Sequence, residues 1–164
     1  MKKSAMKIAD MYAQPGYLIR RAHQTATAVF SGATKDLDLT AVQFSALLAV
    51  KDNPDIDATR VSEMISFDRT TIGHVLERLE GKGWITRKSG VEDKRTKHIR
   101  ITPTGKAIVQ KVSDRVGNIG EDILRPFSAN ERALLIKLLK KFPEDRSLSI
   151  APPKSRSKAK SKTD

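Results

Sequence analysis

Apolar residues recur at helical spacing along most of the chain, and two short runs rich in β-branched residues interrupt this periodicity. Between residues 68 and 83 the spacing i, i+3, i+4, i+7 predicts an amphipathic helix with one buried stripe: Ile72, Val75, Leu76 and Leu79. The segments 84–87 and 97–101 enclose a charged run that contains glycine, and they predict a β-hairpin. A helix followed directly by a charged hairpin is typical of a winged helix-turn-helix, so double-stranded DNA is the expected partner.

Residues that favour helix N-termini divide the chain into six predicted helices. They are Thr40, Asp57, Asp68, Thr102 and Ser128, and Thr40 and Ser128 begin capping-box patterns. The helices are expected over about residues 17–33, 40–51, 57–65, 68–81, 102–126 and 128–142. Breaks are expected at Pro15-Gly16, at Gly32 and at Pro126. The predicted fold class is therefore mainly α with a small β-hairpin wing, an α+β arrangement.

The face of helix 68–81 opposite its buried stripe carries side chains suited to contacts with DNA. At ~100° per residue, this face presents Thr70, His74 and Glu77, flanked by Arg69, Thr71 and Arg78. Hydroxyl, imidazole and guanidinium groups can bond to base edges and phosphates. Helix 57–65 and helix 68–81 would form the helix-turn-helix, with the second lying in the major groove.

The predicted hairpin is strongly basic. Between positions 87 and 100 it has six lysines and arginines, two acids and His98. The residues expected to contact DNA there are Lys88, Asp93, Lys94, Arg95 and Lys97. Charge runs often only solvate a surface, but the position directly after a helix-turn-helix favours a wing that contacts DNA.

The overall charge agrees with a polyanionic partner. The 164 residues have a formal net charge of +12 and a sequence pI near 10.1. Residues 154–162 contribute five positive charges after Pro152-Pro153, which predicts a disordered basic tail. The chain has no cysteine, no secretory signal and no run of about 20 apolar residues, so we expect a cytoplasmic protein without membrane contact.

Three other functional classes compete with a specific regulator. An enzyme is disfavoured because the chain has no phosphate-binding glycine loop and no H-E-x-x-H, and no cofactor is expected. A metal-responsive regulator would need ligand spacing, yet His23, His74 and His98 fall on three different elements. A non-specific architectural DNA-binding protein fits the basic tail, but the polar outer face of helix 68–81 favours sequence reading.

From Leu39 onward the chain resembles the MarR family of bacterial transcription regulators. The resemblance is carried by L-T-A-V-Q-F-S-A-L, by V-S-E-M from Val61, by D-R-T-T-I-G-H-V-L-E-R-L-E-G-K-G-W-I-T-R, by D-K-R at 93–95 and by I-R-I-T-P-T-G. It implies a six-helix homodimer with intertwined terminal helices and one winged helix-turn-helix in each subunit. It further implies that Asp93 braces the hairpin and that Arg95 enters the minor groove.

The resemblance also implies an interface between two subunits. Residues 17–39 and 102–142 would be dimerisation helices around the DNA-binding lobe 40–101, with an arm at 1–16 and the tail at 143–164. The expected interface residues are Leu18, Ile119, Ile123, Leu134, Leu135 and Leu138. The hydrophobic fraction of only 38% agrees with a core completed by a partner subunit.

The N-terminal P-G-Y-L-I-R-R segment resembles a subgroup linked to the catabolism of aromatic acids. A small aromatic carboxylate would then bind in a cleft lined by Tyr17, Arg20, His23, Phe44 and Phe67, with Arg20 or Arg21 as the carboxylate partner. The competing interpretation is that the phenylalanines belong to the core and the arginines face water.

Overall fold

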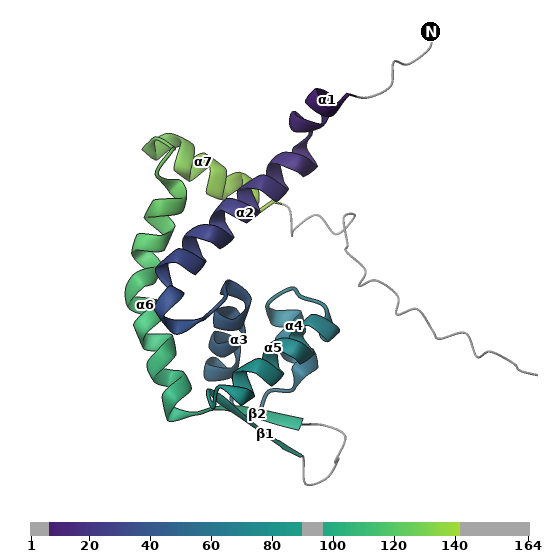
Figure 1. Ribbon diagram of the computed structural model, residues 1–164, viewed down its shortest axis with the longest axis vertical. Helices are drawn as coiled ribbons and strands as arrows, with labels where there is room; N and C mark the ends of the chain where they lie inside the picture. The colour runs from purple at the N-terminus through teal and green to yellow at the C-terminus, as the bar shows by residue number, and fades with distance from the viewer. Residues whose placement is uncertain (1–6, 90–96, 142–164) are drawn as a thin grey trace, which may run out of the picture. The chain divides into compact units, whose positions relative to one another are not determined.

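The computed structural model describes residues 7–89 and 97–141, and this part of the chain is mainly helical (Figure 1). Its elements are α1 (Ile8–Tyr12), α2 (Pro15–Ala33), the 3-10 turn η1 (Lys35–Leu37), α3 (Ala41–Asp52), α4 (Ala58–Met64), α5 (Arg69–Gly81), β1 (Ile85–Ser89), β2 (Lys97–Ile101), α6 (Pro103–Leu124) and α7 (Ala129–Leu139). The two strands form one antiparallel sheet. The predicted fold class, helices with a small β-hairpin, is confirmed.

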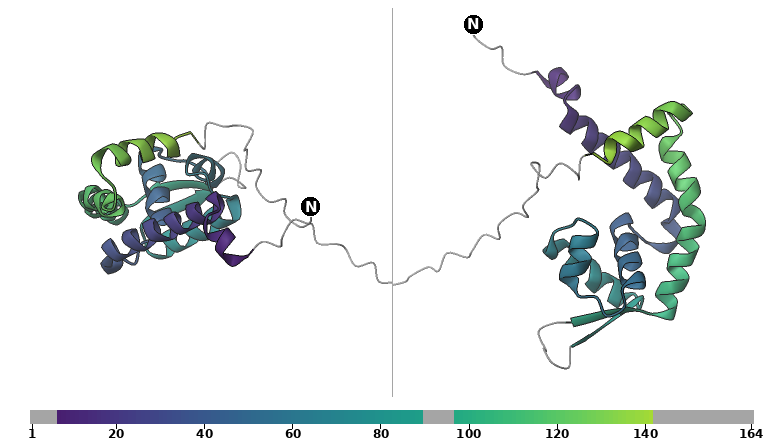
Figure 2. Two further views of the ribbon diagram at one scale, coloured as in Figure 1. Left: turned by 90° about the horizontal axis from the view of Figure 1, so that it is seen from above. Right: turned by 180° about the vertical axis from the view of Figure 1, so that it is seen from behind.

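The chain divides into two compact units, Met1–Pro126 and Phe127–Asp164. The first unit contains every element from α1 to α6, and α7 belongs to the second. Within the first unit α2 packs against α6, and α3, α4 and α5 gather beside the hairpin (Figures 1 and 2).

The predicted helix starts are held by the hydrogen bonds that their sequences require. Thr40 and Gln43 form a reciprocal capping box. Gln43 N donates to Thr40 Oγ1 at 3.3 Å, and Thr40 N donates to Gln43 Oε1 at 3.1 Å. The Asp57 carboxylate accepts from Thr59 N at 2.7 Å, and the Thr102 hydroxyl accepts from Gly105 N at 3.0 Å. Each contact satisfies a backbone donor that the first helical turn leaves without a partner.

The predicted end of the first helix at residue 33 is confirmed, but its predicted start was two residues late. Pro15 is the first residue of α2 rather than a break before it, because the first helical position needs no N–H donor. The break falls at Ala13-Gln14, after the short helix α1 in the segment expected to be an arm. Gly32 lies inside α2, and the helix ends one residue later, where the buried Thr34 hydroxyl bridges Phe30 O at 2.9 Å and Leu39 O at 2.8 Å.

The core of the first unit surrounds the stripe predicted for α5, and all four stripe residues are buried. Its most enclosed large side chains include Leu47 from α3, Ile85 from β1, Ile99 from β2 and Val112 from α6. Burying an aliphatic side chain of this size stabilises a fold by about 1.5–3 kcal/mol. The core therefore fixes which face of α5 remains outside.

The hairpin is joined to the helices at its base. Its register pairs Ile85 with Ile101 and Arg87 with Ile99, and Ile56 forms an isolated bridge to Ile99 from the loop between α3 and α4. The tip, residues 90–96, lies outside the described residues. The first strand begins at Ile85 and not at Trp84, whose side chain is buried just before it.

Candidate nucleic-acid interface

Helix α5 presents a polar face to solvent directly opposite its buried stripe. Arg69, Thr70, His74 and Arg78 are exposed, while Thr71 is half-buried. Their exposure follows from the 3.6-residue period, because the four buried apolar residues occupy the other side. His74 Nδ1 lies 3.4 Å from Glu77 Oε2 one turn later, an exposed pair on the same face.

The N-terminal end of α5 is held in place by Asp68. Its carboxylate accepts from Thr71 N at 2.9 Å and from the Thr71 hydroxyl at 2.5 Å. These hydrogen bonds from Thr71 hold the pKa of Asp68 below its ordinary value. The Thr71 hydroxyl is therefore engaged in the cap, a role that the sequence analysis did not assign to it.

Arg69 is linked across the helix-turn-helix. Its Nη2 donates to Thr59 Oγ1 in α4 at 2.6 Å, and Thr59 N is itself bound by the Asp57 cap. The turn between the helices contains Ser66 with φ of 56°, a left-handed conformation unusual for serine. The two helices are thus fixed to each other by the turn and by a side-chain hydrogen bond.

Two of the six basic hairpin residues brace the fold. Arg87 Nε donates to Glu80 Oε2 on α5 at 2.6 Å, and this hydrogen bond lowers the pKa of Glu80. Arg100 forms a two-pronged pair with Asp55, which likewise lowers the pKa of Asp55. These arginines attach both strands to the helical lobe, as the sequence analysis did not foresee.

The other basic hairpin residues divide between exposed positions and the tip. Lys88 and Lys97 are exposed, near the ends of the two strands. Asp93, Lys94 and Arg95 lie outside the described residues. The arrangement places a polar helix face and a hairpin with exposed lysines on one lobe, as a helix in the major groove and a wing beside it would require.

The five side chains expected to hold an aromatic acid lie in different surroundings. Tyr17 is half-buried, with the Arg20 guanidinium 5.0 Å from its ring centroid and the Tyr12 ring 5.2 Å away. Phe44 is buried against Phe30, with ring centroids 5.9 Å apart. His23 on α2 and Phe67 in the helix-turn-helix turn are exposed. Tyr12 is the aromatic neighbour that the sequence reasoning missed.

The expected interface residues also differ in exposure. Leu18 is 53% exposed, Leu134 54% and Leu138 45%. Leu135 and Ile123 are half-buried, whereas Ile119 is buried within its own chain. Helix α7 has no buried residue, and four of its leucines and isoleucines are more than two-fifths exposed.

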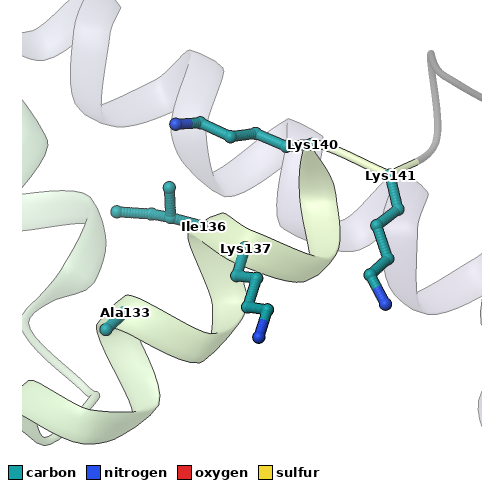
Figure 3. A pocket seen from close by; sticks show the side chains of 5 residues that line it. All are labelled: Ala133, Ile136, Lys137, Lys140 and Lys141. Carbon is teal, nitrogen blue, oxygen red and sulfur yellow. The ribbon is translucent and has the colours of Figure 1, made fainter.

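Helix α7 borders a hollow of about 420 Å³, shown in Figure 3. Its lining residues are Ala133, Ile136, Lys137, Lys140 and Lys141. They recur at spacings of three, four, seven and eight from Ala133, so they form one face of the helix and its C-terminal end. None of the five side chains predicted for an effector lines this hollow.

Among residues 7–89 and 97–141, no group of three or more histidine, aspartate or glutamate side chains is placed to hold a metal ion. No helix in the same ranges is both long enough and apolar enough to cross a membrane.

Comparison with known proteins identifies the family. Residues 39–97 match the model of the MarR family. The multiple antibiotic resistance protein MarR of Salmonella typhimurium is 32% identical over 77% of this chain and 89% of its own length. The chain belongs to the MarR family. The transcriptional repressor NicR of Pseudomonas putida is 28% identical over 81% of this chain and 84% of its own.

Solved structures of this family have the same fold. Bordetella bronchiseptica BpsR, studied for regulation of its DNA binding by 6-hydroxynicotinic acid, matches with a TM-score of 0.75 and 27% identity over 86% of this chain and 99% of its own. A mutant MarR from Escherichia coli in complex with operator DNA matches with a TM-score of 0.74 and 28% identity, over 83% and 98%. As a MarR-family member, this chain is a DNA-binding transcriptional regulator and not an enzyme.

Proposed function

We propose that this MarR-family protein is a homodimeric repressor that binds a pseudo-palindromic operator and leaves it when a small aromatic carboxylate binds. One observation supports operator reading above the others. The buried stripe of α5 holds Arg69, Thr70, His74 and Arg78 outward on the lobe that also presents the hairpin. Two such helices, one from each subunit, would enter major grooves about 34–36 Å apart.

The uncovered apolar side chains support dimerisation. In α7, Leu134, Ile136, Leu138 and Leu139 are between 43% and 54% exposed, and in α2 Leu18 and Ile19 are 53% and 47% exposed. A helix with this many exposed aliphatic residues requires a covering surface in water. A second copy of the chain supplies such a surface, because the same patches are present on both subunits.

The aromatic effector is supported by a relative and by one local contact. BpsR is regulated by 6-hydroxynicotinic acid, and NicR is a repressor. In this chain Arg20 already lies over the Tyr17 ring at 5.0 Å, so a cation and an aromatic face are adjacent on α2. A ring with a carboxylate could pair with the first and stack against the second.

The first experiment measures operator binding directly. Fluorescence anisotropy would compare the intergenic duplex beside the protein's own gene with a shuffled duplex at two salt concentrations. We expect a specificity ratio of about 10³ or more at both salts. Equal affinity for both duplexes that collapses as salt rises would show that charge alone drives binding, which would contradict the proposal and favour an architectural protein.

The effector is tested on the same complex with 6-hydroxynicotinic acid and related aromatic acids. Release of the duplex by one of them, lost in Arg20→Gln and retained in Arg21→Gln, would support the proposed contact. The neighbouring arginine is a matched control because both are exposed on α2 and both substitutions remove one charge. Because linkage is reciprocal, the duplex must weaken acid binding by the same factor. Equal loss of response in both variants would contradict a specific role for Arg20.

A further inference from the structure

The turn that follows α5, residues 82–84, receives contacts from both connections that join the DNA-reading lobe to helices α2 and α6. The first connection is the segment 34–40 between α2 and α3. The second is the corner at Thr102 between β2 and α6. Both belong to the first compact unit, and both reach the turn through contacts between residues far apart in sequence.

The first connection is bound at two aspartates, two residues apart. Asp36 pairs with Arg115 of α6, with Oδ1–Nη1 at 2.6 Å and Oδ2–Nη2 at 3.0 Å, and Arg115 also donates to Ala33 O at 2.9 Å. Asp38 instead accepts from Lys82 Nζ, through its carbonyl oxygen and through Oδ2 at 2.7 Å. One carboxylate therefore anchors the segment to α6, and the other anchors it to the end of α5.

The backbone of this connection is also restrained. Asp38 has φ of 47°, a left-handed conformation that aspartate and asparagine tolerate better than other non-glycine residues. The buried Thr34 hydroxyl closes the segment by donating to Phe30 O and Leu39 O. The connection is thus held by hydrogen bonds at Thr34, Asp36 and Asp38.

The second connection packs against the same turn. The Thr102 hydroxyl donates to Gly83 O at 2.7 Å, and Thr102 N donates to Trp84 O at 2.9 Å. A Cβ built on Gly105 would lie 2.1 Å from Trp84 O, so α6 begins in direct backbone contact with the turn. Lys82 Nζ lies 4.7 Å from the centroid of the Trp84 ring, which connects the two sets of contacts.

From these contacts we propose that Lys82 and Asp38 are positioning residues that set the half-site spacing accepted by the dimer. Lys82 caps the C-terminal end of α5, one turn after Arg78, and Asp38 lies in the segment before α3. Both act by fixing where α5 sits relative to α2 and α6. The inference rests on the proposed function, because spacing has meaning only for a dimer on a two-half-site operator. Changing the spacing by one base pair moves a half-site by about 3.4 Å and rotates it by about 35°. A rigid link resists that displacement and a loosened one accommodates it.

The test begins with the wild-type full-length chain, which selects an operator from a pool of random duplexes. Anisotropy then measures the dissociation constant for the selected duplex and for duplexes with one base pair inserted or removed between half-sites. The spacing ratio is the dissociation constant for a duplex with altered spacing divided by the dissociation constant for the selected duplex. For the wild type we expect a ratio of about tenfold or more, comparable to the cost of a mismatched base pair.

Lys82→Met removes the ammonium group but keeps an unbranched apolar stem over Trp84, and it should lower this ratio by about threefold or more. Asp38→Asn should lower it less, because asparagine tolerates the left-handed backbone and the carbonyl contact to Lys82 remains. Lys82→Arg should restore much of the discrimination. The matched controls are Lys51→Met and Asp52→Asn, which change charge identically at an exposed Lys–Asp pair confined to the end of α3.

The ratio separates positioning from a merely structural role. A loss of stability alone would lower the melting temperature and weaken binding to every spacing equally, leaving the ratio at its wild-type value. An unchanged ratio in folded Lys82→Met and Asp38→Asn, on an operator that the wild type does select, would overturn this inference and leave the proposed function intact. Failure of the wild type to select any duplex would instead contradict the proposed function itself.

Discussion

Helices α5 and α7 both carry apolar residues at helical spacing, but these residues differ in how far they are buried. In α5 the stripe of Ile72, Val75, Leu76 and Leu79 is entirely buried. In α7 no residue is buried, and Leu134 is 54% exposed. Among the described residues, the lobe formed by α3, α4, α5 and the hairpin encloses its own apolar stripe, whereas α7 leaves apolar side chains exposed.

The largest effect is expected at the junction of the lobe and α6. Gly105→Ala would place a Cβ against the Trp84 carbonyl oxygen, a backbone atom that cannot move without displacing the turn. We expect destabilisation of about 3 kcal/mol or more, at or beyond the upper end of overpacking costs, measured by urea denaturation. Gly117→Ala in the same helix is the control, because its Cβ meets nothing within 4 Å and should change stability by no more than about 1 kcal/mol, in the stabilising direction. Similar effects of both substitutions would contradict the close packing described here.

Truncation inside the α5 stripe should be nearly as costly. Leu79 is 0% exposed, so Leu79→Ala removes buried methyl groups and leaves a cavity. We expect a loss of about 2–5 kcal/mol in the free energy of unfolding, independent of protein concentration. A loss below about 1 kcal/mol would mean that α5 is not supported by this core.

Truncation on α7 should act through association. Leu134→Ala is expected to raise the dimer dissociation constant by about tenfold or more, measured by analytical ultracentrifugation, because interface anchors lose contacts only in the dimer. The melting temperature of the Leu134→Ala variant should rise with protein concentration. Arg132→Ala, two residues earlier on the same helix, provides a comparison at a polar position. A wild type that stays monomeric at micromolar concentration would contradict the dimer proposal.

The smallest effect concerns acid stability. Hydrogen bonds from Arg115, Lys82, Arg100 and Arg87 lower the pKa values of Asp36, Asp38, Asp55 and Glu80 respectively. Because each carboxyl binds its proton more weakly in the folded state, the unfolded state takes up more protons as pH falls. The stabilisation is present above the ordinary pKa of about 4 and is lost as pH falls through the lowered values.

Thermal melts between pH 6 and pH 3 measure this dependence. The melting temperature should fall toward pH 3, and Glu80→Gln should melt earlier at pH 6 while losing less on acidification. All four carboxylates lie in the first unit, so the effect tests the lobe and its connections. If the melting temperature of Glu80→Gln fell as steeply with pH as that of the wild type, the Glu80–Arg87 pair would not contribute to the acid sensitivity.

Much of the candidate interface could be predicted from the sequence because it depends on local periodicity. The outward positions of Thr70 and His74 follow from the buried stripe on the same helix, and the Asp68 cap from its place before that stripe. The functions of Arg87 and Arg100 could not be predicted in this way. Both counted as wing charges, but Glu80 and Asp55 hold them, and Asp55 is 45 residues from its partner.

The helices, their caps, the hairpin strands and the polar face of α5 could be read from the sequence alone, since each depends on residues close together in the chain. The family followed from the order of motifs between Leu39 and Gly105. Only the tertiary structure decided which charges brace the lobe, that Phe44 packs on Phe30, and that Asp38 and Thr102 both meet the turn after α5. Those contacts join residues between 7 and 45 positions apart, whose distances depend on how the helices pack and not on any local pattern.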